Sequence, residues 1–499
     1  MVTLGHLRCA LGAQYVLRTT ARGCSTPSAH ADARSEVRSN GDARSDGVVP
    51  RRAVVPGGRS PRLYVSKLFL SFGRSEPHDK LACKSQKLML QNDVMDICHS
   101  GAYHLLPLGQ RALEKLIRLI DWEMSTVGGQ KISMVTIAPA DMWRKTGRWE
   151  STGKEMFKLQ DRHGMEFCLG PTHEELVTSI FASRCPLSYR RLPILLYQIS
   201  RKFRDEIQPK HGLLRAREFE MKDMYSFHTD EASAMETYHS LCEAYSRIFD
   251  RLSVPYVKVR GSTGNIGGSL SHEFHYLAPV GEDKLLLCSH CGVQVNKEMA
   301  DSVEKDCLNS GHDCQLQEVS GTEVGHCFYL GTKYSSVFNA LFEMQLARSS
   351  EWSMKFVKLT HMGCFGLGVT RILQAGLEVL SSDSHLRWPS LLAPYQVCII
   401  PQKEGFEAEI YAELADDLSD QLTQLPALHG EVVIDDRTQL SIGHRVYDAL
   451  QIGYPYIVIL GKKARGNPCI VEVQNTISGE RNFLSRDQLW DLMSSVVTL

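Results

Sequence analysis

Hydrophobic positions recur every three to four residues in three parts of the chain, and this spacing predicts three amphipathic helices. The second helix spans residues 231–253 and the third lies in residues 406–422. The first is within residues 101–124, where one apolar stripe consists of Leu113, Leu116, Ile117, Ile120 and Met124. Apolar runs stay well below the roughly 18 residues that a membrane-spanning helix needs, so we expect no membrane insertion.

Short apolar runs between turn-forming residues predict strands. Residues 156–160 and 166–169 form one such pair. In the last hundred residues, strands at 397–400, 431–434 and 456–460 alternate with the helix at 406–422 and another at 443–452. Alternation of strand and helix is typical of an α/β domain with a largely parallel sheet. We therefore expect a separate C-terminal α/β domain over residues 391–499.

Residues 199–226 hold a dense set of charged and aromatic side chains, and the pattern predicts a hairpin with its turn near Pro209 and Gly212. Arg204 and Glu206 are two positions apart, so as strand residues they would point to the same face. Phe219 follows on the return strand. A guanidinium, a carboxylate and an aromatic ring on one face could hold a phosphate, an amino group and a flat base. The alternative is a surface hairpin with a ladder of Arg–Glu salt bridges.

Composition and charge are those of an ordinary globular protein, because 43% of the 499 residues are hydrophobic and 23% are charged. This length allows two or three domains. The net charge of −1 hides an asymmetry: residues 1–75 carry +8 and the remainder carries −9. A nucleic-acid partner would therefore have to be bound by local basic patches.

The N-terminal segment has the composition of a mitochondrial transit peptide, because residues 1–31 contain Arg8, Arg18 and Arg22 but no Asp or Glu. A plain disordered tail is the alternative. Residues 24–60 have few large apolar side chains and are expected to be disordered. We assign residues 1–75 to the transit peptide and a disordered segment. The 15 cysteines lack the spacing of a small disulfide-bonded domain, which suits a reducing compartment.

Three stretches together resemble the class II aminoacyl-tRNA synthetases. The run Phe203-Arg204-Asp205-Glu206, followed by Arg215, Phe219 and Asp223, is similar to motif 2 of that family, within residues 199–226. Residues 101–139, with Pro107, resemble motif 1, which builds the dimer interface, and residues 363–373 resemble motif 3. The resemblance implies an α+β fold: an antiparallel six-stranded sheet with flanking helices over residues 76–390. It also implies that the C-terminal α/β domain binds the anticodon.

A loop at residues 170–175, Gly-Pro-Thr-His-Glu-Glu, resembles the proline-recognition loop of the prolyl-tRNA synthetases. By spacing alone, Thr172 and Glu175 could instead form a capping box at a helix start. The resemblance implies that Thr172 and Glu174 hold the nitrogen of proline. A secondary ammonium has two N–H donors, which one hydroxyl and one carboxylate satisfy. His326, in a stretch similar to the family's pocket strand, is a further proline-binding candidate; a buried core histidine is the alternative.

The same resemblance implies roles for the remaining polar residues. Arg204 would contact the α-phosphate and the proline carboxylate, and Arg371 the γ-phosphate, which makes both catalytic. Phe219 would stack on adenine. ATP would enter with Mg²⁺ as its counter-ion, and no side chain need act as a nucleophile, because positioning and electrostatics carry such a reaction. The implied ATP site comprises Arg204, Glu206, Arg215, Phe219, Glu273 and Arg371.

A cysteine-containing insertion lies at about residues 285–318. Cys288 and Cys291 have zinc-ligand spacing, but Cys307 and Cys314 are too far apart for a second such pair, so structural zinc is only weakly indicated. Unliganded, reduced cysteines are the alternative. Bacterial prolyl-tRNA synthetases carry an editing insertion of more than a hundred residues here. Only about fifty residues separate Phe274 from Gly325, so the resemblance implies no editing domain.

The C-terminal domain offers two charged segments as candidates for contact with unpaired RNA bases, residues 435–437 and the pair Lys462 and Lys463. Solvated charged loops are the alternative for each.

The sequence thus predicts ATP-dependent attachment of proline to tRNA(Pro) through a prolyl adenylate, by a homodimer in the mitochondrial matrix. Two alternatives are another class IIa synthetase, such as a threonyl enzyme, and a non-catalytic binding protein that kept the fold. Thr172 and Glu174 argue against the first alternative. The retained Arg204 and Arg371 argue against the second.

Overall fold

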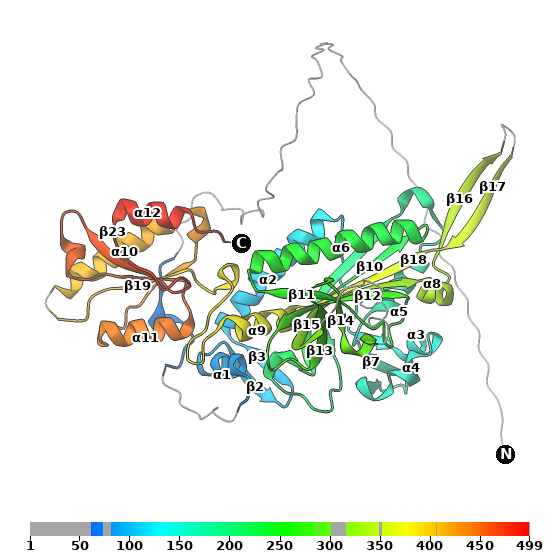
Figure 1. Cartoon of the computed structure of the whole chain (residues 1–499), viewed down its shortest axis with the longest axis horizontal. Helices are drawn as coiled ribbons and strands as arrows, with labels where there is room; N and C mark the ends of the chain where they lie inside the picture. The colour runs from blue at the N-terminus through cyan, green and yellow to red at the C-terminus, as the bar shows by residue number, and fades with distance from the viewer. Residues whose placement is uncertain are drawn as a thin grey trace, which may run out of the picture. The chain divides into compact units, whose positions relative to one another are not determined.

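The computed structural model describes residues 61–72, 81–288, 290–300, 316–348, 352–405 and 407–498. A nine-stranded sheet forms the centre of the larger part of the chain (Figure 1). Its strands, in spatial order, are β12 (Leu270–Leu277), β11 (Tyr256–Arg260), β14 (Gln294–Asn296), β13 (Asp283–Cys288), β15 (Leu316–Gly331), β18 (His361–Gly368), β10 (Glu218–His228), β9 (Ile194–Phe203) and β4 (Gln130–Lys131).

The sheet is larger and less uniform than the predicted six antiparallel strands. Six strands do pair antiparallel, in the spatial order β11, β12, β15, β18, β10 and β9. However, β4 runs parallel to β9 and β14 parallel to β11. β15 has 16 residues, so β13 pairs with its first part and β12 with its second. Strands as short as β4 and β14 leave no periodic pattern from which a sequence could predict them.

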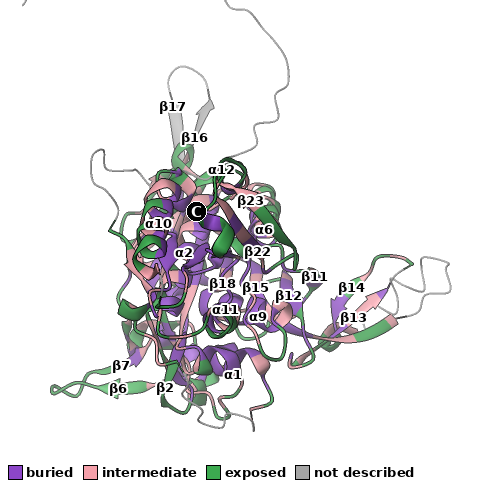
Figure 2. Ribbon diagram, turned by 90° about the vertical axis from the view of Figure 1, so that its left-hand side faces the viewer, coloured by how far each residue is buried: buried purple, intermediate pink, exposed green. Residues whose placement is uncertain are grey.

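Helices cover both faces of this sheet and define two core clusters. One cluster joins the sheet to α1 (Lys84–Gln91), α2 (Pro107–Thr126), α6 (Glu231–Leu252) and α9 (Val369–Leu380). The other joins it to α3 (Ala140–Lys145), α4 (Arg148–Ser151), α5 (Glu174–Ala182) and α8 (Lys333–Phe338). Met224 belongs to the first cluster and Tyr225 to the second, as the alternation of side chains along β10 requires. Figure 2 shows the buried residues in purple along the central strands.

The predicted apolar stripe of the first helix is confirmed, because Leu113, Leu116, Ile120 and Met124 of α2 are buried. The predicted helix at 231–253 corresponds to α6. Smaller sheets complete this part of the chain: β2 (Met95–His99) with β3 (Ala102–Leu105), β5 (Ile137–Pro139) with β7 (Glu166–Leu169) and β6 (Lys158–Gln160), and β8 (Leu187–Ser188) with β16 (Leu341–Arg348) and β17 (Trp352–Leu359). Among the helices that the structure describes, none is long and apolar enough to cross a bilayer.

The C-terminal part has the predicted α/β architecture. β20 (Val432–Ile434), β19 (Val397–Ile400) and β21 (Tyr456–Ile459) are parallel, and β22 (Ile470–Asn475) and β23 (Arg481–Ser485) extend the sheet antiparallel. Its helices are α10 (Ala408–Leu422), α11 (Ile442–Ile452) and α12 (Arg486–Ser494). Parallel strands joined by helices bury both sheet faces, which explains the continuous apolar runs in the sequence.

The N-terminal segment requires a correction. The sequence placed residues 1–75 in a transit peptide and disordered segment, but β1 (Leu63–Tyr64) pairs parallel with β20. Arg62 makes ion pairs with Asp416 and Asp420, and Val65 is buried. Residues 62–66 therefore pack with the C-terminal domain, while Ser71 hydrogen-bonds with Asp93 before β2. A two-residue strand is too short to show a periodic pattern. The proposed transit peptide, residues 1–31, and the expected disorder at 24–60 lie outside the described residues.

Candidate functional site

A cavity of about 200 Å³ lies against the large sheet, lined from β10, β15, β18 and the starts of α5 and α9. Its lining includes six residues that the sequence predicted for the site: Thr172, Glu174, Arg204, Phe219, His326 and Arg371. These residues are up to two hundred positions apart in the chain. Their convergence makes this cavity the candidate functional site.

The floor of the cavity is the buried carboxylate of Glu174, the first residue of α5. Its Oε1 accepts hydrogen bonds from the Thr172 hydroxyl at 2.8 Å and from the Cys364 thiol at 3.4 Å. Arg148 Nη1 donates to Oε2 at 2.9 Å. Burial opposes ionisation, yet the charge and hydrogen bond of Arg148 and the bond from Thr172 bring the pKa of Glu174 below its ordinary value. Glu174 is thus held as a carboxylate.

The capping-box alternative for this loop is wrong. The Thr172 hydroxyl donates to Glu174, and the N-cap position of α5 belongs to His173. Glu175 accepts from the Thr146 hydroxyl at 2.8 Å and from Arg148 at 3.1 Å. Burial and the charge of Glu174 raise the pKa of Glu175, against the opposing effect of Arg148. The residues of this loop therefore serve a charged site and not the helix end.

Arg204 occupies the loop directly after β9, not a strand. The expectation that Arg204 and Glu206 share a strand face is therefore wrong, because β9 ends at Phe203. The guanidinium carbon of Arg204 lies 5.4 Å from the centre of the Phe219 ring. Burial and the nearby charge of Arg371 lower the pKa of Arg204. Two guanidinium groups that repel each other in one cavity favour binding of an anion between them.

Glu323 is a cavity residue that the sequence analysis did not identify. Its carboxylate lies 3.0 Å from His326 Nδ1 and 3.9 Å from Arg371 Nη1. Burial opposes its ionisation, but the bond from His326 and the charge of Arg371 lower the pKa of Glu323 strongly. The His326 ring stacks on Phe328 with 3.7 Å between ring centres. His326 therefore lines the cavity and is not an ordinary core histidine.

Three residues of the predicted ATP site do not line the cavity. The described residues that line the cavity do not include Glu206, Arg215 or Glu273. Glu206 accepts from Arg215 Nη2 at 2.9 Å, and Arg215 also pairs with Glu282. Glu273 Oε1 lies 3.9 Å from His326 Nε2, at the edge of the cavity.

A buried network holds the Thr172 loop against the sheet. Asp223 Oδ1 pairs with Lys202 Nζ at 2.7 Å, and Asp223 Oδ2 accepts from the Tyr225 hydroxyl at 3.0 Å. The backbone N–H of His173 donates to the same hydroxyl at 2.9 Å. Asp223 itself lines the cavity. The sequence analysis named only Asp223 of this network, although all four residues lie within residues 170–175 and 199–226.

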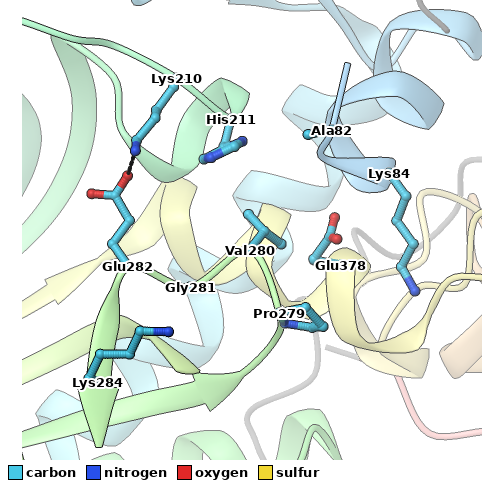
Figure 3. A pocket seen from close by; sticks show the side chains of 10 residues that line it. All are labelled: Ala82, Lys84, Lys210, His211, Pro279, Val280, Gly281, Glu282, Lys284 and Glu378. Atoms are coloured by element: carbon cyan, nitrogen blue, oxygen red, sulfur yellow. Dashed lines mark ion pairs between the residues drawn. The ribbon is translucent and has the colours of Figure 1, made fainter. Parts of the chain in front are cut away.

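A larger cavity of about 730 Å³ lies elsewhere and shows that size does not identify the site (Figure 3). None of the predicted site residues is among the ten described residues that line it. Its lysines have partners: Lys210 pairs with Glu282 at 2.6 Å, Lys84 donates to the Ser381 carbonyl at 2.7 Å, and Lys284 donates to the Ser320 hydroxyl at 2.8 Å.

The zinc and RNA predictions concern other parts of the chain. Cys307 and Cys314 lie outside the described residues, and within the described ones no group of three or more His, Cys, Asp or Glu side chains is arranged to hold a metal ion. The weak indication of structural zinc is therefore not tested. Asp435 and Arg437 are buried and paired with each other at 2.7 Å, whereas Asp436 is half-buried. Contact of this segment with RNA stays a prediction. Lys462 and Lys463 are exposed, and their role stays a prediction.

Comparison with known proteins gives matches to both parts of the chain. Residues 157–380 match the tRNA synthetase class II core domain (G, H, P, S and T), and residues 396–495 match the anticodon binding domain. A probable mitochondrial proline–tRNA ligase of Rattus norvegicus is 49% identical, covering 88% of this chain and 92% of the relative. The corresponding Homo sapiens protein is 48% identical over 88% of this chain and 93% of its own. A proline–tRNA ligase of Sulfurimonas denitrificans is 36% identical, covering 80% of this chain and 92% of the relative.

Solved structures share the fold at low identity. Prolyl-tRNA synthetase from Cryptosporidium parvum, complexed with L-proline and AMP, aligns with a TM-score of 0.65 and 18% identity over 83% of this chain and 75% of that one. Giardia lamblia prolyl-tRNA synthetase, in complex with prolyl-adenylate, aligns with a TM-score of 0.66 and 20% identity over 81% and 74% of the two chains.

Proposed function

The chain belongs to the proline–tRNA ligases of the class II aminoacyl-tRNA synthetases, and from this premise we propose that it attaches proline to tRNA(Pro) for mitochondrial translation. The reaction runs in two steps through a prolyl adenylate. The observation that carries the proposal is one cavity that joins a buried carboxylate, Glu174, to two guanidinium groups, Arg204 and Arg371. The carboxylate of Glu174 suits a cationic amine, and the two guanidinium groups suit a carboxylate and phosphates.

At the proline end, we assign the secondary ammonium to Thr172 and Glu174. The Thr172 hydroxyl and the Glu174 carboxylate lie 2.8 Å apart, so their oxygens can accept both N–H donors of one nitrogen. Arg204 faces the proline carboxylate from the cavity wall. His326 closes the ring pocket with Phe328, against which its own ring stacks.

In the first step, an oxygen of the proline carboxylate attacks the α-phosphorus of ATP and pyrophosphate leaves. Arg204 offsets the charge that develops on the α-phosphate, and Arg371 holds the leaving pyrophosphate. Phe219 stacks on adenine and fixes the nucleotide. In the second step, a hydroxyl of the 3′-terminal ribose of tRNA attacks the prolyl carbonyl and AMP leaves. The rate enhancement comes from positioning and electrostatics.

The remaining ATP contacts are proposals that rest on the family resemblance. Mg²⁺ accompanies ATP as counter-ion, and carboxylates of Glu323 and Glu273 beside His326 are the oxygen ligands that this ion prefers. Glu206 and Arg215 reach the adenine and phosphates only if their mutual ion pair shifts toward the cavity when ATP binds.

Assembly and location are further parts of the proposal. The sheet of β5, β7 and β6 and the segment before it expose Val135, Ile137, Leu159 and Met165 by 62%, 53%, 40% and 54%. Val135 and Ile137 belong to the segment that resembles motif 1, and we assign these exposed apolar residues to contact with a second copy in a homodimer. We assign residues 1–31 to a transit peptide and the protein to the mitochondrial matrix, as the names of the mammalian relatives support.

The decisive experiment is ATP–pyrophosphate exchange with each amino acid in turn, using the wild type and Arg204→Ala. We expect exchange with proline, and a fall of about 10²–10³-fold in kcat/KM in the variant, the size seen when one transition-state donor is removed. Arg201→Ala is the matched control, because the Arg201 side chain is 67% exposed on β9, the strand that precedes Arg204, and pairs with Glu218. Exchange with threonine would overturn the substrate. Lack of exchange from folded protein would favour the non-catalytic binding protein.

A further inference from the structure

Beneath the cavity lies a buried group of three charges that spans two helices. Arg148 begins α4, and Glu174 and Glu175 begin α5. The exposed fractions of the three residues are 5%, 0% and 0%. Buried charges need close partners. The charge left on Glu174 at the cavity therefore depends on how Arg148 pairs with each of the two carboxylates.

One nitrogen of Arg148 serves both carboxylates. Nη1 lies 2.9 Å from Glu174 Oε2 and 3.1 Å from each oxygen of Glu175. The guanidinium carbon also lies 4.7 Å from the centre of the Trp143 ring, so an aromatic side chain covers it. Arg148 is therefore fixed between the two carboxylates and shared by them.

The two carboxylates differ in what they face. The described residues that line the cavity include Glu174 but not Glu175. Glu175 points to the Thr146 hydroxyl at 2.8 Å. Oε1 of Glu174, the oxygen that does not pair with Arg148, accepts hydrogen bonds from the Thr172 hydroxyl and the Cys364 thiol. Both donors are neutral. When both carboxylates are ionised, the group has one guanidinium and two carboxylates, and Glu174 is the carboxylate that faces the cavity.

We infer that Glu175 sets the affinity for the cationic nitrogen of the amino acid substrate without touching it. By taking a share of Arg148, Glu175 leaves Glu174 with an uncompensated negative charge. The bound secondary ammonium supplies the missing cation and closes the group to neutrality. Glu175 is thus a positioning residue of the proposed proline site, and this inference rests on the proposed function.

A purely structural role for Glu175 makes a different prediction. In that case Glu175 only holds α5 against α4 through Thr146 and Arg148, and its loss would disturb every ligand of the cavity alike. If Glu175 acts through charge, its loss affects only ligands that carry a cation. The two roles therefore separate when ligands with and without an ammonium group are compared.

The test is Glu175→Gln in the full chain, because glutamine keeps the size of the side chain and removes its charge. Arg148 then compensates Glu174 alone. We expect the KM for proline in ATP–pyrophosphate exchange to rise by about 10- to 100-fold, the range for losing one charge-assisted interaction. The KM for ATP should stay within about twofold, because the phosphates contact the other end of the cavity. Thr146→Val is the matched control, since it removes the hydrogen bond to Glu175 and keeps the charge.

Binding of three small ligands, measured by calorimetry, distinguishes charge from structure. L-proline and L-prolinol carry the ammonium, whereas tetrahydrofuran-2-carboxylate has a ring oxygen in place of the nitrogen. In Glu175→Gln, we expect proline and prolinol to weaken by the same factor and the oxygen analogue to bind as in the wild type or more tightly. Equal weakening of all three, or unchanged binding of proline, would overturn the inference. Lack of proline-dependent exchange in the wild type would instead overturn the proposed function.

Discussion

Buried arginine–carboxylate groups occur in both domains, but they differ in charge balance. In the C-terminal domain, Arg437 pairs with Asp435 at 2.7 Å and with Asp448 at 2.9 Å. Arg445 donates to the backbone carbonyls of Asp435 at 2.9 Å and Pro401 at 2.7 Å. Two cations and two anions close this group to neutrality. Under the candidate cavity, by contrast, one cation, Arg148, serves two anions.

The comparison separates buried charges that hold a fold from buried charges that bind. A balanced group has its partners inside the protein, so it offers little to a ligand. An unbalanced group beside a cavity lacks one partner, and a ligand of opposite charge can supply it. Both groups consist of arginines and carboxylates, so the kind of charge present does not distinguish them. The two groups are distinguished by their balance of cations and anions and by whether a charge faces a cavity.

The largest effect is expected from Arg437→Met, which removes the guanidinium that pairs directly with the buried carboxylates of Asp435 and Asp448. Removing one partner of a buried ion pair costs about 3–5 kcal/mol, and we expect this loss in the unfolding free energy of the C-terminal domain. Denaturant unfolding of the full chain measures it. Proline-dependent ATP–pyrophosphate exchange should persist, because the cavity lies in the other domain. Lys463→Met, at an exposed position, is the control. Unchanged stability would mean that the group is solvated and that the comparison fails.

A smaller effect, on activity instead of stability, is expected from Glu174→Gln. The variant keeps Arg148 paired with Glu175, so we expect the midpoint of thermal unfolding to move little. The proline cation loses its charged partner, and kcat/KM for proline should fall about 100-fold, equivalent to about 2.7 kcal/mol. Exchange assays measure the expected fall in kcat/KM, and thermal unfolding measures the midpoint that should stay nearly unchanged. Glu150→Gln, exposed on α4, is the control. A variant that unfolds readily but activates proline normally would reverse the assignment.

Much of the fold could be predicted because its helices are locally encoded. The stripes of α2 and α6 each lie within one helix, so spacing alone reveals the buried face. The full extent of the sheet could not be predicted, because β4, β14 and β1 are only two or three residues long. Such strands exist because longer neighbours offer them hydrogen bonds, and no local pattern records that.

The candidate site, like the fold, could be predicted only in part. Thr172, Glu174, Arg204 and Arg371 each lie in a contiguous stretch with a recognisable pattern, and the structure brings them to one cavity. Arg148 precedes Glu174 by 26 residues and lies outside those stretches. Its role exists only through the packing of α4 on α5. Charge balance is a property of that packing, so a sequence can indicate the ligands of a site without indicating what tunes them.

A third buried group joins the two domains, and its imbalance has the opposite sign. Lys115 of α2 pairs with Glu431 at 2.6 Å, and Arg111 pairs with the same carboxylate at 2.8 Å. Two cations thus share one anion. Burial, against the opposing effect of Glu431, lowers the pKa of Lys115 to about 8. An unbalanced buried charge can be relieved in two ways, by binding a counter-ion or by changing its protonation. Glu174, with a lowered pKa, keeps its charge; Lys115 is able to lose its own.

This difference predicts a pH dependence of stability at the contact between the domains. The pKa of Lys115 falls from 10.5 to about 8 on folding, so between these values the unfolded chain binds more protons than the folded one. Stability from this group therefore rises with pH across that window, and Lys115→Met removes the rise. Between pH 7.5 and 9.5, the unfolding free energy of the wild type should gain about 2 kcal/mol on that of the variant. Denaturant unfolding of both proteins at the two pH values measures the gain.

A constant difference between the two proteins would mean that Lys115 stays charged on Glu431 throughout this range. The interdomain group would then tolerate a surplus charge with neither a ligand nor a proton change, and imbalance alone would no longer indicate binding. The expected gain would instead show that Lys115 loses its surplus charge only above about pH 8, whereas the lowered pKa of Glu174 keeps this carboxylate ionised across the same range. The Glu174 carboxylate faces a cavity lined by the residues proposed to hold proline, so a cationic substrate can balance its charge there.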